Sequence, residues 1–231
     1  YCPNKMNKKL TIILTLKDRI DFTYRWMNYM NDIKCPYHIL IADGGIDKGI
    51  EDYLSDKQNY SDLDYTYIRY PADKTLANFY KKFVAVIGLV KTPYLLFADN
   101  DDFFLIDQVP VFLDFLNENP YYTSCGGSNV HLSLFSGSNC VVNSTDASNY
   151  IATVTDVNRS VENSTGIERI EHFMKYNDTR DLWSCWYQIQ RTSNIVAAFD
   201  FLNTYQFKDI VAYEIHIHLQ LLFRGKYKEL K

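Results

Sequence analysis

The sequence contains no apolar run that approaches the roughly 20 residues of a membrane-spanning helix. It also has no excess of positive charge, because its formal net charge is −4 and its isoelectric point is about 5.7. These absences argue against a transmembrane segment and against nucleic acid as the main partner. No signal peptide is recognisable, but the sequence starts at Tyr1 rather than Met, so this absence has little weight.

Cysteine is scarce, and no two cysteines have the close spacing of a zinc site. The five residues, an odd number, are Cys2, Cys35, Cys125, Cys140 and Cys185. We interpret them as mostly reduced thiols, which favours a cytoplasmic location; peripheral association with the inner face of a membrane stays open. Internal repeats and a clear linker are also lacking, so residues 1–231 are expected to form one domain.

Strand-like and helix-like segments alternate over the first 100 residues. Buried strands are expected at 9–16, 37–42, 64–70 and 94–97, and helices between them near 20–33, 46–58 and 75–90. This alternation predicts an α/β fold with a mostly parallel central sheet and helices on both faces.

The second half of the chain has a different pattern. Helices are expected at 107–117, 166–176, 192–202 and 214–224, and a short strand at 122–125. Residues around 126–165 are rich in Ser, Asn and Thr and contain short alternating runs. They predict a small β-rich insertion of one or two hairpins that covers a sheet edge or a cleft.

Three carboxylates, Asp99, Asp101 and Asp102, follow the fourth expected strand within four residues. Like charges this close favour a bound cation, and oxygen ligands suit Mg²⁺ or Mn²⁺, which also bind phosphates. An acidic turn after a core strand is the alternative. Parallel strands would bring other polar residues to the same edge, which favours a metal and phosphate site. Those residues are Thr15, Lys17, Asp18 and Asp43.

Residues 98–102 (Ala-Asp-Asn-Asp-Asp) resemble the Asp-x-Asp motif, with its usual trailing Asp, of family 2 glycosyltransferases, which have the GT-A fold. Residues 39–45 are similar to that family's second strand, which ends in an Asp near the nucleotide base or ribose. Residues 11–17 are similar to its first strand, although Leu14 and Lys17 stand in place of the usual Pro and Asn.

Two further segments carry the resemblance. In residues 76–78 (Leu-Ala-Asn), Ala77 stands where an Arg often precedes the Asn, and Lys74 is a candidate to supply that charge instead. Residues 212–214 (Ala-Tyr-Glu), followed later by Gly225 and Tyr227, are similar to a segment that usually reads Glu-Asp and then Gly-Tyr. The similarity is strong over 9–104 and weak over 126–180.

The resemblance implies a metal-dependent, inverting transferase that moves a sugar from a nucleotide-sugar donor, with a UDP-sugar favoured. The acceptor would be a glycan or a lipid-linked molecule in polysaccharide or glycoconjugate biosynthesis. Residues 1–104 would bind the donor and 105–231 the acceptor. The expected metal ligands are Asp101, Asp99 and Asp102, the nucleotide contacts are Thr15, Asp43, Lys74 and Asp99, and the catalytic base is Glu214.

Several of these assignments have alternatives. Trp183, Trp186 and Tyr187 could stack on an acceptor sugar or belong to the core. Asp209 is a rival base, and Lys17 and Arg19 could meet phosphate or only solvent. His216 and His218 would face different ways on a helix, so a joint metal site is not expected.

Two other functions compete with glycosyl transfer. A sugar-nucleotidyltransferase would share the fold class but is expected to have a glycine-rich phosphate loop after the first strand, and residues 16–19 contain no glycine. A catalytically inactive glycan-binding or scaffold domain would keep the fold without binding a nucleotide in a metal-dependent way.

Overall fold

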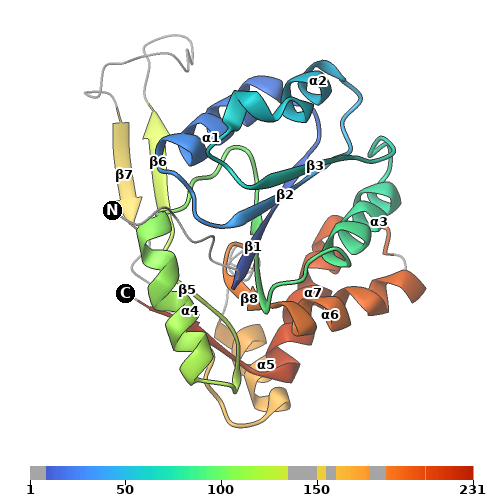
Figure 1. The fold of residues 1–231 in the computed structure, drawn as a ribbon. Coiled ribbons are helices and arrows are strands. Elements are labelled where there is room, and N and C mark those ends of the chain that lie inside the picture. Colours follow the sequence, from blue (N-terminus) through green and yellow to red (C-terminus); the bar gives the residue numbers. More distant parts are fainter. Residues whose placement is uncertain (1–8, 135–149, 155–159, 177–185, 206, 231) are drawn as a thin grey trace.

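The computed structural model describes residues 9–134, 150–154, 160–176, 186–205 and 207–230. Its centre is a seven-stranded sheet in the order β3-β2-β1-β4-β8-β5-β9 (Figure 1). The strands are β1 (Leu10–Leu16), β2 (His38–Asp43), β3 (Tyr65–Arg69), β4 (Tyr94–Ala98), β5 (Tyr122–Gly126), β8 (Ile189–Arg191) and β9 (Lys226–Glu229). The α/β fold with a mostly parallel central sheet is therefore confirmed.

Strand direction decides where a ligand can bind. β1 runs parallel to β2 and β4, and β2 runs parallel to β3, so these four strands end at the same edge of the sheet. The order reverses between β1 and β4, which is the point at which open α/β sheets bind their ligands. β8 pairs antiparallel with β4 and β5, so the residues just before β8 lie near the end of β4.

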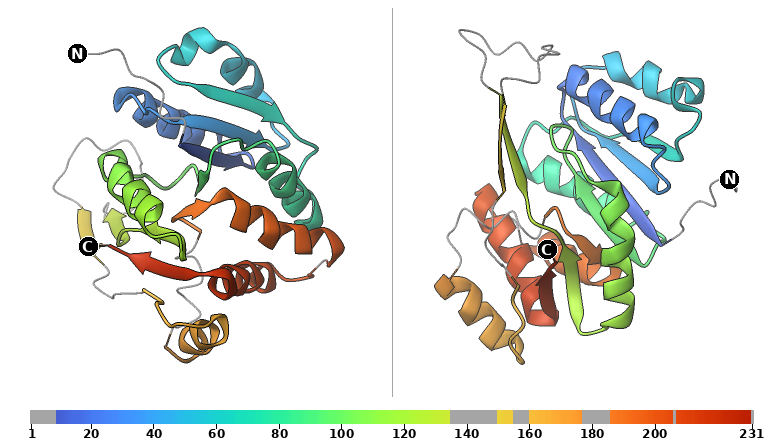
Figure 2. Two further views of the ribbon diagram at one scale, coloured as in Figure 1. Left: turned by 60° about the horizontal axis from the view of Figure 1, so that its bottom comes forward. Right: turned by 90° about the vertical axis from the view of Figure 1, so that its left-hand side faces the viewer.

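Helices cover both faces of the sheet (Figures 1 and 2). Leu10, Ile12 and Leu14 of β1 point to a core cluster with α1, α2 and α4, whereas Ile13 points to a second cluster with α3, α6 and α7. This period of two is what a strand buried on both faces requires. The helices are α1 (Ile20–Asp32), α2 (Gly49–Ser55), α3 (Leu76–Ile87), α4 (Val109–Glu118), α6 (Thr192–Thr204) and α7 (Ile210–Arg224).

Three elements lie outside the central sheet and the two helix layers that cover it. α5 (Gly166–Tyr176) packs Phe173 against α7 and β9 in a third, smaller cluster. β6 (Val130–Leu134) and β7 (Tyr150–Val154) form a separate antiparallel pair, which confirms a hairpin in the β-rich segment (Figure 1). Whether the hairpin covers a cleft stays a prediction. Among the described residues, no helix has the length and apolar character needed to cross a membrane.

Two helices have other boundaries than the sequence predicts, and in both cases a capping residue explains the difference. The helix expected over 46–58 spans only α2, because Asp56 has an extended backbone and its carboxylate accepts a hydrogen bond from the Gln58 amide at 2.9 Å. α7 begins at Ile210 rather than Glu214, because the Asp209 carboxylate caps it from 2.7 Å at the Val211 amide.

Candidate active site

The polar residues expected at one edge of the sheet do converge there. Asp99, directly after β4, lies beside Thr15 of β1, whose hydroxyl is 3.4 Å from the carboxylate. Tyr187, two residues before β8, donates its hydroxyl to the other oxygen of Asp99 at 2.8 Å. The antiparallel pairing of β8 with β4 explains this contact, because it brings a residue 88 positions later in sequence to the end of β4.

Asp99 and Tyr187 are electrostatically linked. Burial raises the pKa of Asp99, the charges of Asp101 and Asp102 raise it further, and the hydrogen bond from Tyr187 opposes the rise. Burial raises the pKa of Tyr187 well above its ordinary value, and the neighbouring charge of Asp99 adds to this. Tyr187 therefore remains a protonated donor at physiological pH and keeps the Asp99 carboxylate in one orientation.

Asp101 and Asp102 lie on the solvent side of the same loop and are both exposed. Asp101 forms an ion pair with Arg19, and the middle residue of the motif, Asn100, is buried and bonds to the backbone oxygen of Arg19. Within the described residues, no three acidic, His or Cys side chains are grouped closely enough to hold a metal ion as they stand.

The donor set nevertheless fits Mg²⁺ or Mn²⁺ in its chemistry. Asp99, Asp101 and Asp102 present hard carboxylate oxygens at one loop, and a cationic guanidinium already lies 2.6 Å from Asp101. Mg²⁺ is commonly held through only one or two carboxylates, with waters and substrate phosphates completing its shell. A site shared between this loop and a diphosphate is therefore compatible with the arrangement.

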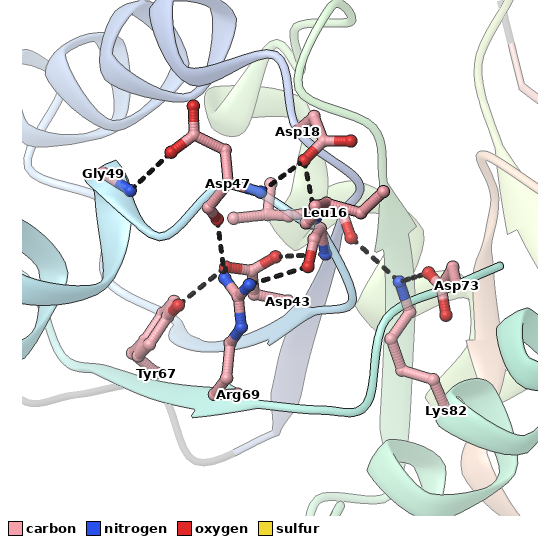
Figure 3. Close-up of polar contacts among 11 residues, drawn as sticks. Leu16, Asp18, Asp43, Asp47, Gly49, Tyr67, Arg69, Asp73 and Lys82 are labelled. Carbon is pink, nitrogen blue, oxygen red and sulfur yellow. Dashed lines mark hydrogen bonds and ion pairs between the residues drawn. The ribbon is translucent and has the colours of Figure 1, made fainter.

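Asp43, at the end of β2, is only 1% exposed and has both oxygens bonded within the protein. One oxygen accepts from Tyr67 and Arg69 of β3, each at 2.6 Å, and the other accepts from the Gly45 amide at 2.7 Å (Figure 3). The structure thus shows Asp43 fixing the turn after β2. Its expected contact with a nucleotide stays a prediction.

Two other residues, Arg69 and Asp18, also form hydrogen bonds to the turn after β2. Arg69 also donates to the backbone oxygens of Gly45 and Asp47, at 2.7 and 2.9 Å. Asp18, in the loop after β1, accepts from the amides of Ile46 and Asp47 (Figure 3), and the Asp47 amide is the main cause of its lowered pKa. The loops after β1 and β2 are therefore cross-linked at the sheet edge.

A buried lysine that the sequence interpretation missed completes this edge. Lys82 of α3 donates to the Leu16 backbone oxygen at 2.9 Å and forms an ion pair with Asp73 at 2.5 Å (Figure 3). Burial raises the pKa of Asp73 and lowers that of Lys82, while their mutual attraction opposes both shifts. A Cβ at Gly44 would lie 2.4 Å from an Asp73 oxygen, so this approach requires glycine.

A sequence signal for Lys82 does exist. It lies three residues after Phe79 and four before Val86, on the apolar face of α3. A charged residue in that position needs a buried partner. Lys74, the residue considered as a substitute for the Arg that often precedes the Asn of residues 76–78, is exposed just before α3.

Glu214 is half-buried in α7, near α3. The ring of its neighbour Tyr213 stacks on Tyr80 of α3 with the centroids 3.7 Å apart. Burial raises the pKa of Tyr80, and the charge of Glu214 is the next contribution. Asp209, the rival base, uses its carboxylate as the cap of α7.

The two histidines of α7 pack separately, as their spacing predicts. His218 is buried and stacks on Phe173 of α5, with the ring centroids 4.1 Å apart. His216 stacks on Phe201 of α6 at 4.4 Å. The two rings therefore lie against different helices, α5 and α6.

The aromatic cluster expected to touch the acceptor is only partly described. Trp186 stacks on Phe97 of β4, with the centroids 4.7 Å apart, and also contacts Phe83 of α3. The Trp186 ring is thus partly in the core, and Tyr187 contacts Asp99 of the loop after β4. Trp183 lies outside the described residues.

No family model matches the sequence, and no curated protein matches it. Among solved structures, the chain is similar to S. aureus TarS 1-349, with a TM-score of 0.56 and 12% identity over 96% of this chain. It is also similar to TarS 1-349 in complex with UDP (TM-score 0.55, 14% identity) and with UDP-GlcNAc (TM-score 0.54, 14% identity), over 96% of this chain in both. The chain spans 56–58% of these TarS structures. At this identity the likeness shows a GT-A-like fold.

Proposed function

We propose that this chain is a metal-dependent, inverting glycosyltransferase that transfers a sugar from a UDP-sugar to a glycan or lipid-linked acceptor at the cytoplasmic side of the cell. The observation that carries the proposal is the position of Asp99, held by Thr15 and Tyr187 where the strand order reverses. The complexes of TarS with UDP and UDP-GlcNAc, which share the fold, support the choice of donor.

In the proposed site, Asp101, Asp99 and Asp102 would hold Mn²⁺ or Mg²⁺, which when bound neutralises the charge of a leaving diphosphate. Thr15 and Asp99 would face the nucleotide, and Lys74 is free to reach phosphate from the solvent side. Asp43 would act on the base or ribose through the turn that it holds.

Glu214 is proposed to take the proton from the acceptor hydroxyl as a general base. A base, rather than a nucleophile, implies inversion at the anomeric carbon. Glu214→Gln is expected to keep donor binding and to lower transfer about 100-fold to 10,000-fold. A product with retained anomeric configuration would refute the inverting part of the proposal.

The first experiment is a calorimetric titration with UDP, GDP and CDP, each with and without Mn²⁺. We expect UDP to bind in a Mn²⁺-dependent way, and Asp101→Asn to weaken this at least about tenfold through loss of a charged ligand. Asp114→Asn, which removes an exposed charge from α4, is the matched control and is expected to bind as the wild type does.

The alternatives predict other results. A catalytically inactive scaffold domain would bind none of the three nucleotides under either condition, and that outcome refutes the proposal. A sugar-nucleotidyltransferase would release pyrophosphate from a nucleoside triphosphate and a sugar phosphate, which a pyrophosphate assay detects.

A further inference from the structure

An ion pair joins the loops that follow the two strands at the point of order reversal. Arg19, just before α1, contacts Asp101, after β4, with 2.6 Å between Nη1 and Oδ2. The Arg19 side chain is 58% exposed and that of Asp101 is 41% exposed. A cation of the protein itself therefore occupies the carboxylate that is the first candidate for a metal ligand.

The backbone of Arg19 is fixed even though its side chain is open to solvent. Asp18 and Arg19 both have a positive φ of 60°, an uncommon conformation for residues other than glycine. The buried Asn100 amide donates to the Arg19 oxygen at 3.3 Å and to the Thr23 hydroxyl at 3.1 Å. Because these contacts bind the β1 loop to the β4 loop, only the guanidinium can readily exchange its partner.

Breaking the ion pair between Arg19 and Asp101 costs little free energy. An exposed ion pair contributes only about 0.2–1 kcal/mol, so Arg19 can leave Asp101 at little cost. A guanidinium also presents a planar set of donors that fits phosphate oxygens in a bidentate way. A divalent cation that takes Asp101 would bring the diphosphate next to the released side chain.

We infer that Arg19 is a donor-positioning residue that pairs with Asp101 in the free protein and moves to the diphosphate when a divalent cation and the nucleotide bind. This inference rests on the proposed function. In the free protein Arg19 competes with the cation for Asp101 and so weakens cation binding. In the complex Arg19 binds the diphosphate and so strengthens nucleotide binding.

The two roles predict opposite effects of one substitution. Arg19→Gln is expected to tighten binding of Mn²⁺ alone by about twofold to fivefold, because a competitor of that strength is removed. The same variant is expected to weaken UDP binding in the presence of saturating Mn²⁺ by about tenfold or more, because a charged hydrogen bond is lost. A merely structural role for Arg19 would not change the two affinities in opposite directions.

Two further variants control for net charge and for folding. Arg25→Gln removes the same charge from α1, the helix that begins directly after Arg19. The Arg25 guanidinium lies 4.5 Å from the centre of the Phe22 ring, and the substitution is expected to leave both affinities unchanged. Arg19→Lys keeps the charge and is expected to restore wild-type Mn²⁺ affinity, but not full UDP affinity. Thermal unfolding of each variant would test whether it is folded.

Calorimetry with Mn²⁺ alone, and with UDP at saturating Mn²⁺, measures both affinities. If the wild type binds both ligands and Arg19→Gln fails to shift them in opposite directions, the inference is overturned and the proposed function stands. If the wild type binds neither Mn²⁺ nor UDP, the proposed function is overturned and the inference with it.

Discussion

Lys82 and Asp73 form an ion pair that is almost completely removed from solvent, with each side chain only 1% exposed. Lys82 also donates to the backbone oxygen of Leu16, the last residue of β1. The pair therefore connects α3, the loop before it and the strand that ends at the proposed donor site. No corresponding contact was expected from the sequence.

Removing one partner of this pair is expected to be strongly destabilising. Lys82→Met leaves the Asp73 carboxylate buried without its cation, which should lower the free energy of unfolding by about 3–5 kcal/mol. Lys82→Met combined with Asp73→Ala should lose less than Lys82→Met alone, because no buried charge remains. Urea unfolding measures both, and Lys81→Met, on an exposed position of α3, is the control. A double variant less stable than Lys82→Met would contradict this account.

The four-strand half of the sheet was predictable because β1 to β4 are buried on both faces or end in polar residues. Their apolar runs and the helices between them produce a pattern that is local in sequence. β8 and β9 were missed because they span only Ile189–Arg191 and Lys226–Glu229. Runs of three and four residues carry no period, and their pairing depends on partners far along the chain.

In the candidate site, too, features that are local in sequence could be predicted, and those that depend on pairing with distant strands could not. Thr15 and Asp99 could be found because each stands at a strand end, and parallel strands bring such ends together. Tyr187 was a candidate either for acceptor contact or for the core. Its bond to Asp99 depends on the antiparallel pairing of β8 with β4, which the sequence does not reveal. The burial of Asp43 beneath Tyr67 and Arg69 likewise depends on the register of β2 and β3.

Arg169 of α5 is expected to resist even a conservative substitution. Its buried guanidinium donates to four backbone oxygens at the ends of two segments, namely those of Leu222, Phe223, Asn163 and Ser164. Lysine cannot reproduce this planar set of donors, so Arg169→Lys should lower the free energy of unfolding by about 2–3 kcal/mol. The matched control is Arg224→Lys, at an exposed position of α7, which should stay within about 0.5 kcal/mol. Equal effects of the two substitutions would show that the carbonyl contacts contribute little.

Tyr187→Phe tests the link between β8 and the acidic loop. Without the hydroxyl, the one contact that the Asp99 carboxylate keeps with a described side chain is the longer one with Thr15, so stability should fall by about 1–2 kcal/mol. Mn²⁺-dependent UDP affinity should fall as well, because Asp99 loses its fixed orientation. Tyr205→Phe, at a position that is 55% exposed, is the control for loss of a hydroxyl. Unchanged UDP affinity in Tyr187→Phe would separate Tyr187 from the donor site.

His218 is expected to make stability depend on pH. Burial lowers its pKa from 6.5 to about 3, and neither ring nitrogen has a hydrogen-bond partner among the described residues. The unfolded chain binds a proton at this residue below pH 6.5, whereas the folded chain binds it only near pH 3. Between these values the unfolded state holds more protons, so the free energy of unfolding should fall as the pH is lowered, by up to about 1.4 kcal/mol per pH unit.

His218→Leu removes this titration and a buried, unpaired N–H group. The variant should match or exceed the wild type in stability at pH 7, and its advantage should grow steadily as the pH is lowered from 6.5 toward 3. His216→Leu is the control, because burial lowers the pKa of that half-buried residue as well but by less, so its advantage at low pH should be smaller. Denaturant unfolding at several pH values gives the comparison. A constant difference between His218→Leu and the wild type across this range would show that His218 is protonated equally in both states, which is incompatible with its burial against Phe173.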